Sequence, residues 1–205
     1  MNTAIELNKD INFLYFLKKI PELSILRKIV ENNIVHNNEN VFDHTHKVLE
    51  NTELLTRRFQ IKGRKKFLLL LSAVLHDYGK KETLVTKDDN TTSCPGHEIV
   101  SEKLIRENMF LDRFILSEEE KLWILTFIGN HNKIHETLDK DDLFFETSIE
   151  KLRLEFPNMI LEYLLFGMAD LQNSDFKNYD EAGYNRRIKL LENKLINEIE
   201  RLRLN

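Results

Sequence analysis

The apolar run FLLLLSAVL, residues 67 to 75, constrains the fold more than any other stretch of the sequence. It lies in a segment, 64 to 77, whose apolar residues cover nearly every face of a helix, and such a helix has to be surrounded by others. The run is far shorter than the roughly 20 residues that cross a bilayer. The sequence therefore predicts a central helix of a soluble bundle, with His76 and Asp77 emerging from its middle.

The rest of the chain is also predicted to be helical. Only 6 Gly and 3 Pro occur in 205 residues, and apolar residues recur mostly at three- and four-residue steps. No segment shows a convincing strand pattern. We expect an all-α, single-domain helical bundle, with helices near 5–19, 22–32, 42–60, 64–77, 97–110, 118–131, 142–155, 158–175 and 180–203.

Three regions are expected along the chain. Residues 1–40 would form an N-terminal helical cap, 41–178 the core, and 179–205 a C-terminal amphipathic helix. The apolar stripe of that last helix should pack back on the core, with a homodimer interface as the alternative. The longest stretch without helical period is 79–96, and ordered loops of this length are often functional.

The charge balance excludes binding of nucleic acid through an overall basic field. The chain has 30 Lys and Arg against 34 Asp and Glu, a formal charge of -4. One stretch, TRRFQIKGRKKF at 56–67, is basic without any acid. We expect it to be a solvated corner between helices, with an RNA-facing patch as the alternative.

The cysteine content and the N-terminus predict a cytoplasmic protein. Cys94 is the only cysteine, so it cannot form an internal disulfide, and the opening MNTAIELNKDINF has charges where a signal peptide needs an apolar core. Cys94 lies three residues before His97, but no base can be identified for it. We therefore expect no catalytic role for this thiol.

Several further residues have the chemistry of metal ligands. His44 lies one turn into a predicted helix, His131 ends one, and His97 begins one, where the helix N-terminus favours anions and keeps an imidazole neutral. Asp170 lies in an otherwise apolar helix, where an ionised carboxylate is costly unless it is paired or metal-bound. Each of these residues alone, like the His-Asp pair at 76–77, is more often structural than a ligand.

Their order along the chain resembles the HD-domain superfamily of metal-dependent phosphohydrolases. The resemblance spans roughly 41–175 and rests on VHNNENVFDHTHKVLE, LLSAVLHDYGKKET, CPGHEIVSEKL, NHNK and MADLQNS. Within the superfamily, the chain is most similar to the HD domain that follows the nucleotidyltransferase part of some bacterial CCA-adding enzymes, a likeness that includes IPELSILRKIV and begins near residue 20. No glycine-serine followed by paired aspartates is present, so the nucleotide-adding half is absent.

The resemblance implies roles for particular side chains. The ligands of a first divalent metal would be His44, His76, Asp77 and Asp170. A second metal position, or the grip on the substrate phosphate, would be completed by His97 and His131. The catalytic residues would be Asp77, Lys80, His97 and His131, with Lys80 neutralising the phosphate. No role carries over to His46, which stands where the family usually has an aliphatic residue.

Two other branches of the superfamily do not fit. Gly79, Lys80 and Lys81 follow the His-Asp pair where alarmone hydrolases have an HDxxED pattern. The signature elements of cyclic-di-GMP phosphodiesterases are missing as well.

The expected chemistry follows from the donor set. Imidazoles and carboxylates make a borderline-hard site compatible with Mn, Fe, Co, Ni, Zn or Mg. A metal-activated water would attack the phosphorus of a nucleotide or an RNA end, as in a phosphatase, a nucleotidase or a 2',3'-cyclic phosphodiesterase. The alternatives are hydrolysis of a dinucleoside polyphosphate, and a catalytically silent bundle that binds a nucleotide or a protein partner.

Overall fold

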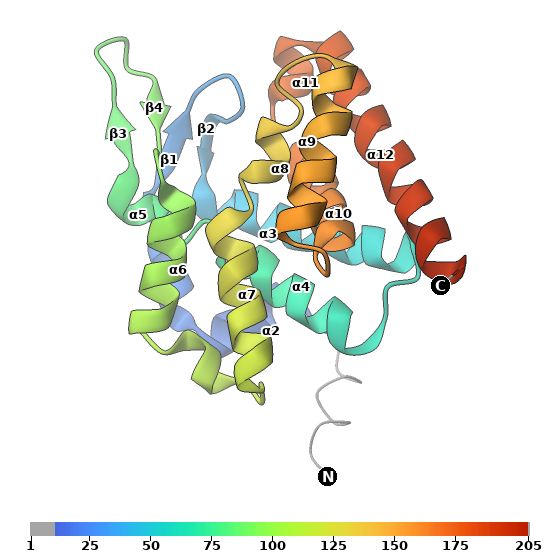
Figure 1. The fold of residues 1–205 in the computed structure, drawn as a ribbon. Coiled ribbons are helices and arrows are strands. Elements are labelled where there is room, and N and C mark those ends of the chain that lie inside the picture. The colour runs from blue at the N-terminus through green and yellow to red at the C-terminus, as the bar shows by residue number, and fades with distance from the viewer. Residues whose placement is uncertain (1–10, 205) are drawn as a thin grey trace.

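The computed structural model describes residues 11–204, which form an all-α bundle with two small hairpins, so the predicted fold class is confirmed (Figure 1). The elements in chain order are α2 (Phe13–Lys19), the 3-10 helix η1 (Pro21–Lys28), β1 (Val30–Asn32), β2 (Asn37–Asn40), α3 (Val41–Arg58), α4 (Gly63–Leu75), α5 (Lys80–Thr83), β3 (Val85–Thr86), β4 (Thr92–Ser93), α6 (His97–Glu107), the 3-10 helix η2 (Phe110–Arg113), α7 (Glu118–Asn130), α8 (Lys133–Glu136), α9 (Asp142–Glu155), α10 (Ile160–Leu171), α11 (Phe176–Tyr179) and α12 (Glu181–Leu204).

Helix α4 lies at the centre of the bundle, as its apolar sequence predicts. Every residue from Phe67 to Leu75 is buried, and the hydroxyl of Ser72 donates to the Leu68 carbonyl at 2.9 Å. Helices α2, α3, α7 and α10 contact α4. Its faces serve two apolar clusters: Leu70 packs with α2, α6 and α7, whereas Leu69 packs with the C-terminal helices.

The two hairpins correct the expectation that the chain contains no strand. Strand β1 pairs with β2 and β3 with β4, both antiparallel. Strands of two to four residues are too short for an alternating pattern to be visible in the sequence. The predicted helix at 22–32 was therefore wrong in part, because η1 ends at Lys28 and β1 follows.

The other predicted helices are present, with shifted ends. Helix α2 begins at Phe13 because the Asn12 side chain accepts a hydrogen bond from the Tyr15 N–H, and residues 5–10 of the predicted helix lie outside the described residues. The predicted loop at 79–96 contains α5 and the β3–β4 hairpin. Helix α12 packs on α10 and α11, with Leu191 and Leu195 fully buried. A homodimer stays a prediction.

The basic stretch at 56–67 is paired with acids of the chain itself. Its ion pairs are Arg57–Glu53, Arg58–Glu192, Arg64–Glu120, Lys65–Glu162 and Lys66–Glu53. This internal pairing favours a solvated corner between helices over an RNA-facing patch. Among residues 11–204, no helix combines the length and the apolarity that a membrane span requires.

The start of α7 is fixed by the capping box that its sequence predicts, and an arginine from α4 joins it. The Ser117 hydroxyl accepts from the Glu120 N–H, and Glu120 accepts from the Ser117 N–H at 2.8 Å. The Arg64 guanidinium donates to both Glu120 oxygens, at 2.7 Å to Oε2. The hydrogen bond from Arg64 is the main reason that the pKa of Glu120 is lowered to about 2.

We predict that Glu120→Gln lowers the free energy of unfolding at pH 7 by about 1 kcal/mol, a figure reduced from the full pKa shift because the pair is partly exposed. The folded pKa lies below the ordinary value of 4.5. The contribution is therefore complete above that value, and is lost as the pH falls toward 2. Urea unfolding from pH 7 to 3 measures it.

The control is Glu119→Gln, in the same helical turn. Its difference from the wild type should be smaller and should not follow this pH dependence. Equal losses in the two variants at every pH would contradict the assigned role of the Arg64–Glu120 pair.

Candidate metal centre

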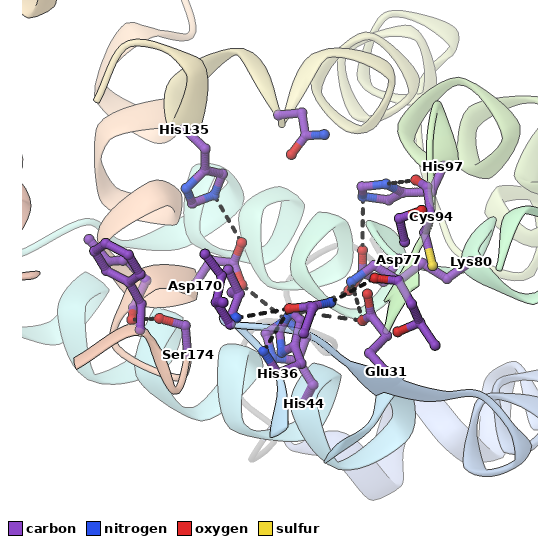
Figure 2. A pocket seen from close by; sticks show the side chains of 18 of the residues that line it. Glu31, His36, His44, Asp77, Lys80, Cys94, His97, His135, Asp170 and Ser174 are labelled. Atoms are coloured by element: carbon purple, nitrogen blue, oxygen red, sulfur yellow. Dashed lines mark hydrogen bonds and ion pairs between the residues drawn. The ribbon is translucent and has the colours of Figure 1, made fainter. Parts of the chain in front are cut away.

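Five of the six predicted ligand residues line one cavity of about 510 Å³, and the sixth, His76, contacts Asp77 from outside its lining (Figure 2). They arrive on separate elements: His44 from α3, the 76–77 pair from the end of α4, His97 from the start of α6, His131 from the end of α7, and Asp170 from the last turn of α10. Sequence separation is therefore no guide to their proximity.

Asp77 is the centre of this cluster. Its Oδ2 lies 3.0 Å from His76 Nε2 and 3.6 Å from His44 Nε2. Its Oδ1 lies 3.2 Å from His97 Nε2. The cluster extends from His44 Nε2 to Asp170 Oδ1 at 3.0 Å, and His97 Nε2 lies 3.2 Å from His131 Nε2.

Each imidazole presents the same nitrogen to the cluster. The Nδ1 atoms of His76, His97 and His131 lie 2.7 to 2.9 Å from the carbonyl oxygens of Ala73, Cys94 and Ile128. A carbonyl oxygen only accepts, so each Nδ1 carries the proton and each Nε2 keeps a lone pair in the neutral ring. His44 is oriented in the same way by a carboxylate, because Glu39 Oε2 lies 3.6 Å from its Nδ1.

These residues fit a divalent cation. His76 Nε2 and Asp77 Oδ2 are buried without a hydrogen-bond partner, which is costly for polar atoms. Among the described residues, three sets of three ligand atoms lie within 4.8 Å of one another, none of which includes Asp170. One set is His36, Glu39 and His44, and the other two share Asp77: His44, His76 and Asp77, and Asp77, His97 and His131. Since Asp77 belongs to both of the latter sets and turns a different oxygen to each, the geometry could accommodate one ion or a bridged pair.

A glycine allows α6 to approach the end of α4 this closely. A Cβ on Gly79 would lie 2.3 Å from the His97 carbonyl oxygen and 2.5 Å from the Ser101 nitrogen. The Gly79 N–H instead donates to the Ser101 hydroxyl at 2.7 Å. Gly79 therefore sets the distance at which His97 meets Asp77.

The carboxylates of the cluster are ionised. Burial alone would raise the pKa of Asp77, but neighbouring His76 and Lys80 outweigh it and hold that pKa well below its usual value. Burial likewise opposes the lowered pKa of Asp170, which hydrogen bonds from His135 and His44 produce. Burial would lower the pKa of His44, but the bonds to Asp170 and Glu39 raise it to about 9. At neutral pH an incoming cation would thus displace a proton from His44.

The pKa values of the two remaining histidines are shifted in opposite directions. The helix N-terminus was expected to keep His97 neutral, but the pKa of His97 is raised. Burial lowers this pKa, and the hydrogen bond and negative charge of Asp77 outweigh both burial and the helix N-terminus. The pKa of His131 is well below its ordinary value because of burial and then of electrostatic interaction with the neighbouring His76 and His97. His131 therefore suits a neutral ligand or acceptor better than a cationic group.

Lys80 is buried and already paired. Its ammonium lies 2.6 Å from Glu31 Oε2 and 2.9 Å from Asp77 Oδ2. Burial would lower its pKa, but these two carboxylates raise it above the ordinary value. An ammonium has three N–H donors; one donates to Glu31, and the contact with Asp77 is an ion pair, so a donor remains for a further acceptor.

Some residues of the site were missed in the sequence. Glu31 and His36 come from the β1–β2 hairpin and line the cavity, and Glu39 contacts His44. His135 was not among the predicted ligands, but its Nε2 lies 2.9 Å from Asp170 Oδ2. The four-residue spacing from His131 was a usable signal for His135. Glu31, His36 and Glu39 of the hairpin had no such signal in the sequence, because their strands were not predictable.

Cys94 also lines the cavity but is chemically quiet. Burial, followed by the negative charge of Glu31, raises the pKa of its thiol to about 12. The thiolate is therefore scarce at neutral pH, which supports the expectation that Cys94 is not a nucleophile.

Comparison with known proteins identifies the class. The family model of the HD domain matches residues 41–202, which is most of the chain. The chain belongs to the HD domain family, and it is a metal-dependent phosphohydrolase with a buried cluster of His and Asp. A search of curated proteins gave no significant match.

We predict that His44→Ala loses metal binding while His46→Ala, two residues along the same helix, keeps it. The His46 ring stacks on Phe13 at 4.6 Å and lies outside the cluster. Unfolding measured with a divalent ion at about 100 times its Kd should show a gain of about 2.7 kcal/mol for the wild type and for His46→Ala. In His44→Ala and Asp170→Ala, the added ion should raise the free energy of unfolding by less than about 1 kcal/mol, which is a smaller increase than in the wild type.

Elemental analysis of the purified variants gives the second readout. If both His44→Ala and Asp170→Ala retain metal at the wild-type level, the assignment of these residues as ligands is contradicted.

Proposed function

We propose that this enzyme hydrolyses a phosphoester bond of a nucleotide or of an RNA end. The observation that carries the proposal is Asp77: a buried carboxylate whose two oxygens face two sets of imidazoles, at the floor of a cavity open to a small substrate. The resemblance to the HD domain of CCA-adding enzymes supports nucleotides and RNA ends as substrates, and the cavity does not contradict it.

The metal ligands in this proposal are His44, His76, Asp77 and Asp170. His97 and His131 complete a second position or hold the phosphoryl oxygens. The bound ion, of the series Mn, Fe, Co, Ni, Zn or Mg, supplies Lewis acidity toward the phosphoryl group and lowers the pKa of water.

The chain's own residues do the positioning. Asp77 accepts a hydrogen bond from the attacking water and fixes its direction. The free N–H of Lys80 and the imidazole of His97, whose pKa is raised, donate to phosphoryl oxygens as charge develops on them. His131, being neutral, contributes a lone pair and no charge.

A catalytically silent bundle is the competing function, and Lys80 counts against it. A fold that needed only stability would gain little from burying an ammonium and two carboxylates together, because apolar replacements of such groups are often neutral or stabilising. In the proposed enzyme the same lysine has a use at the phosphoryl group.

We predict that Asp77→Ala reduces turnover at least about 1000-fold, since it removes a ligand and the water-orienting group together. The helical fold should persist, as measured by far-UV circular dichroism. The matched control is Asp112→Ala, an acid on η2 outside the cavity, which should retain wild-type turnover. Activity in Asp77→Ala within tenfold of the wild type would contradict the role.

The substrate test is a panel with Mn, Ni and Co as added ions. It contains 2',3'-cyclic nucleotides, nucleoside monophosphates, phosphorylated RNA ends and dinucleoside polyphosphates. Hydrolysis of any of the first three supports the proposal. Hydrolysis confined to dinucleoside polyphosphates, or none with any ion, would favour the alternatives.

A further inference from the structure

The cavity continues beyond the histidine cluster into an apolar part. This part is lined by Ile34 and Val35 of the β1–β2 turn and by Leu171 and Phe176. Figure 2 shows Ser174, which lies between the latter two in the chain, on the far side of Asp170 from His97 and Lys80. The Asp175 N–H donates to the Val35 carbonyl at 2.7 Å, so the hairpin and the α10–α11 turn meet at this end.

The β1–β2 turn is held rigidly against its neighbours. The Asn33 side chain accepts from the N–H groups of Val35 and His36, at 2.8 and 2.9 Å. The Asn37 N–H donates to Asp175 Oδ2 at 3.0 Å on one side of the hairpin. On the other side, the Asn32 N–H donates to the Thr92 hydroxyl at 2.7 Å. The turn therefore presents its side chains in one fixed conformation, at little entropic cost to a ligand.

Two apolar side chains of this turn stay open. Ile34 is 53% exposed and Val35 36% exposed, although both line a cavity. The other wall is firm, because the Arg187 guanidinium lies 4.5 Å above the Phe176 ring and 3.6 Å from Asp139. Exposed aliphatic groups on a rigid frame, continuous with a metal cluster, form a surface that an uncharged organic group would cover.

The charges of the cavity limit the number of phosphoryl groups. Among the described residues that line it, the acids are Glu31, Asp77, Asp139 and Asp170, and the bases are Lys80 and Arg187 together with five histidines: His36, His44, His97, His131 and His135. Lys80 and Arg187 are paired with acids within 4 Å. Apart from the histidines around the metal centre, the described lining has no unpaired Lys or Arg to neutralise a chain of phosphates, which favours a single phosphoryl group at the centre.

We propose that the apolar part binds the alcohol portion of a substrate with one phosphoryl group, and that Ile34 and Val35 determine which alcohol is accepted. The substrate class is a phosphomonoester or cyclic phosphate of an uncharged alcohol with apolar surface. This proposal rests on the proposed function. It disfavours dinucleoside polyphosphates, whose additional phosphates would find no unpaired Lys or Arg in the cavity.

The test compares phenyl phosphate with inorganic phosphate, because only the former has an alcohol portion. In the double variant Ile34→Ala, Val35→Ala, the KM for phenyl phosphate should rise about 3- to 10-fold. The inhibition constant of inorganic phosphate and kcat should stay within twofold. The control is Leu154→Ala, an exposed aliphatic residue of α9 outside the cavity, which should leave all three constants unchanged.

The possible outcomes distinguish failure of the subsite from failure of the proposed function. A KM for phenyl phosphate that does not change, or that rises in parallel with the inhibition constant of phosphate, overturns the subsite. If the wild type shows no turnover with any ion, the proposed function fails, and calorimetric Kd values of the metal-loaded protein for phenyl phosphate and for phosphate then decide. The subsite stands if the double variant weakens the first alone, and falls otherwise.

A further experiment tests whether the cavity accommodates only one phosphoryl group. At fixed free metal concentration, adenosine monophosphate should inhibit phenyl phosphate hydrolysis at least about tenfold more strongly than adenosine triphosphate, which has the same alcohol and additional phosphates. Equal or stronger inhibition by the triphosphate overturns the single-phosphoryl assignment.

Discussion

The structure depends on the burial of one carboxylate. Asp77 is 1% exposed at the end of a helix whose preceding residues are apolar. An isolated ionised carboxylate in such surroundings would cost several kcal/mol. It is tolerated because His76 and Lys80 lie in the same turn and His44 and His97 reach it from α3 and α6. Each helix that packs on α4 near this point thus has an electrostatic reason to be there, as well as an apolar one.

The same requirement explains why the N-terminal hairpin belongs to the site. Lys80 offsets the charge of Asp77, and Glu31 of β1 in turn holds Lys80. Glu39, at the end of β2, orients His44 and is itself paired with Lys47. The segment before α3 therefore supplies charge as well as cover. We propose to regard the β1–β2 hairpin, residues 30–40, as a part of the functional site.

Membership in the HD domain family assigns the reaction class but not the substrate. The cluster of imidazoles and carboxylates contains the residues on which the resemblance to the family rests. The hairpin turn, the α10–α11 turn and the loop at 79–96 form the surrounding walls, and these are the segments whose shape and charge can distinguish one phosphoester from another. The apolar surface of Ile34 and Val35 lies in these walls.

The resemblance to the HD domain pointed to the candidate ligands, whereas the sequence by itself determined the helical class, the central position of α4, the capping box at Ser117 and the unusual place of Asp170. These features depend on local periodicity, on caps and on the cost of placing Asp170 in an apolar helix, all of which are encoded within a few residues.

Tertiary structure alone decided the rest. The β1–β2 hairpin forms because Asp175 and Thr92, far away in the chain, satisfy its backbone groups, so no local pattern could predict it. The raised pKa of His97 results from its contact with Asp77 and not from its position at the start of a helix. His135 joined the site only because α8 turns it toward Asp170. Hydrogen bonds and electrostatic contacts between distant segments depend on three-dimensional distance, which the order of residues does not contain.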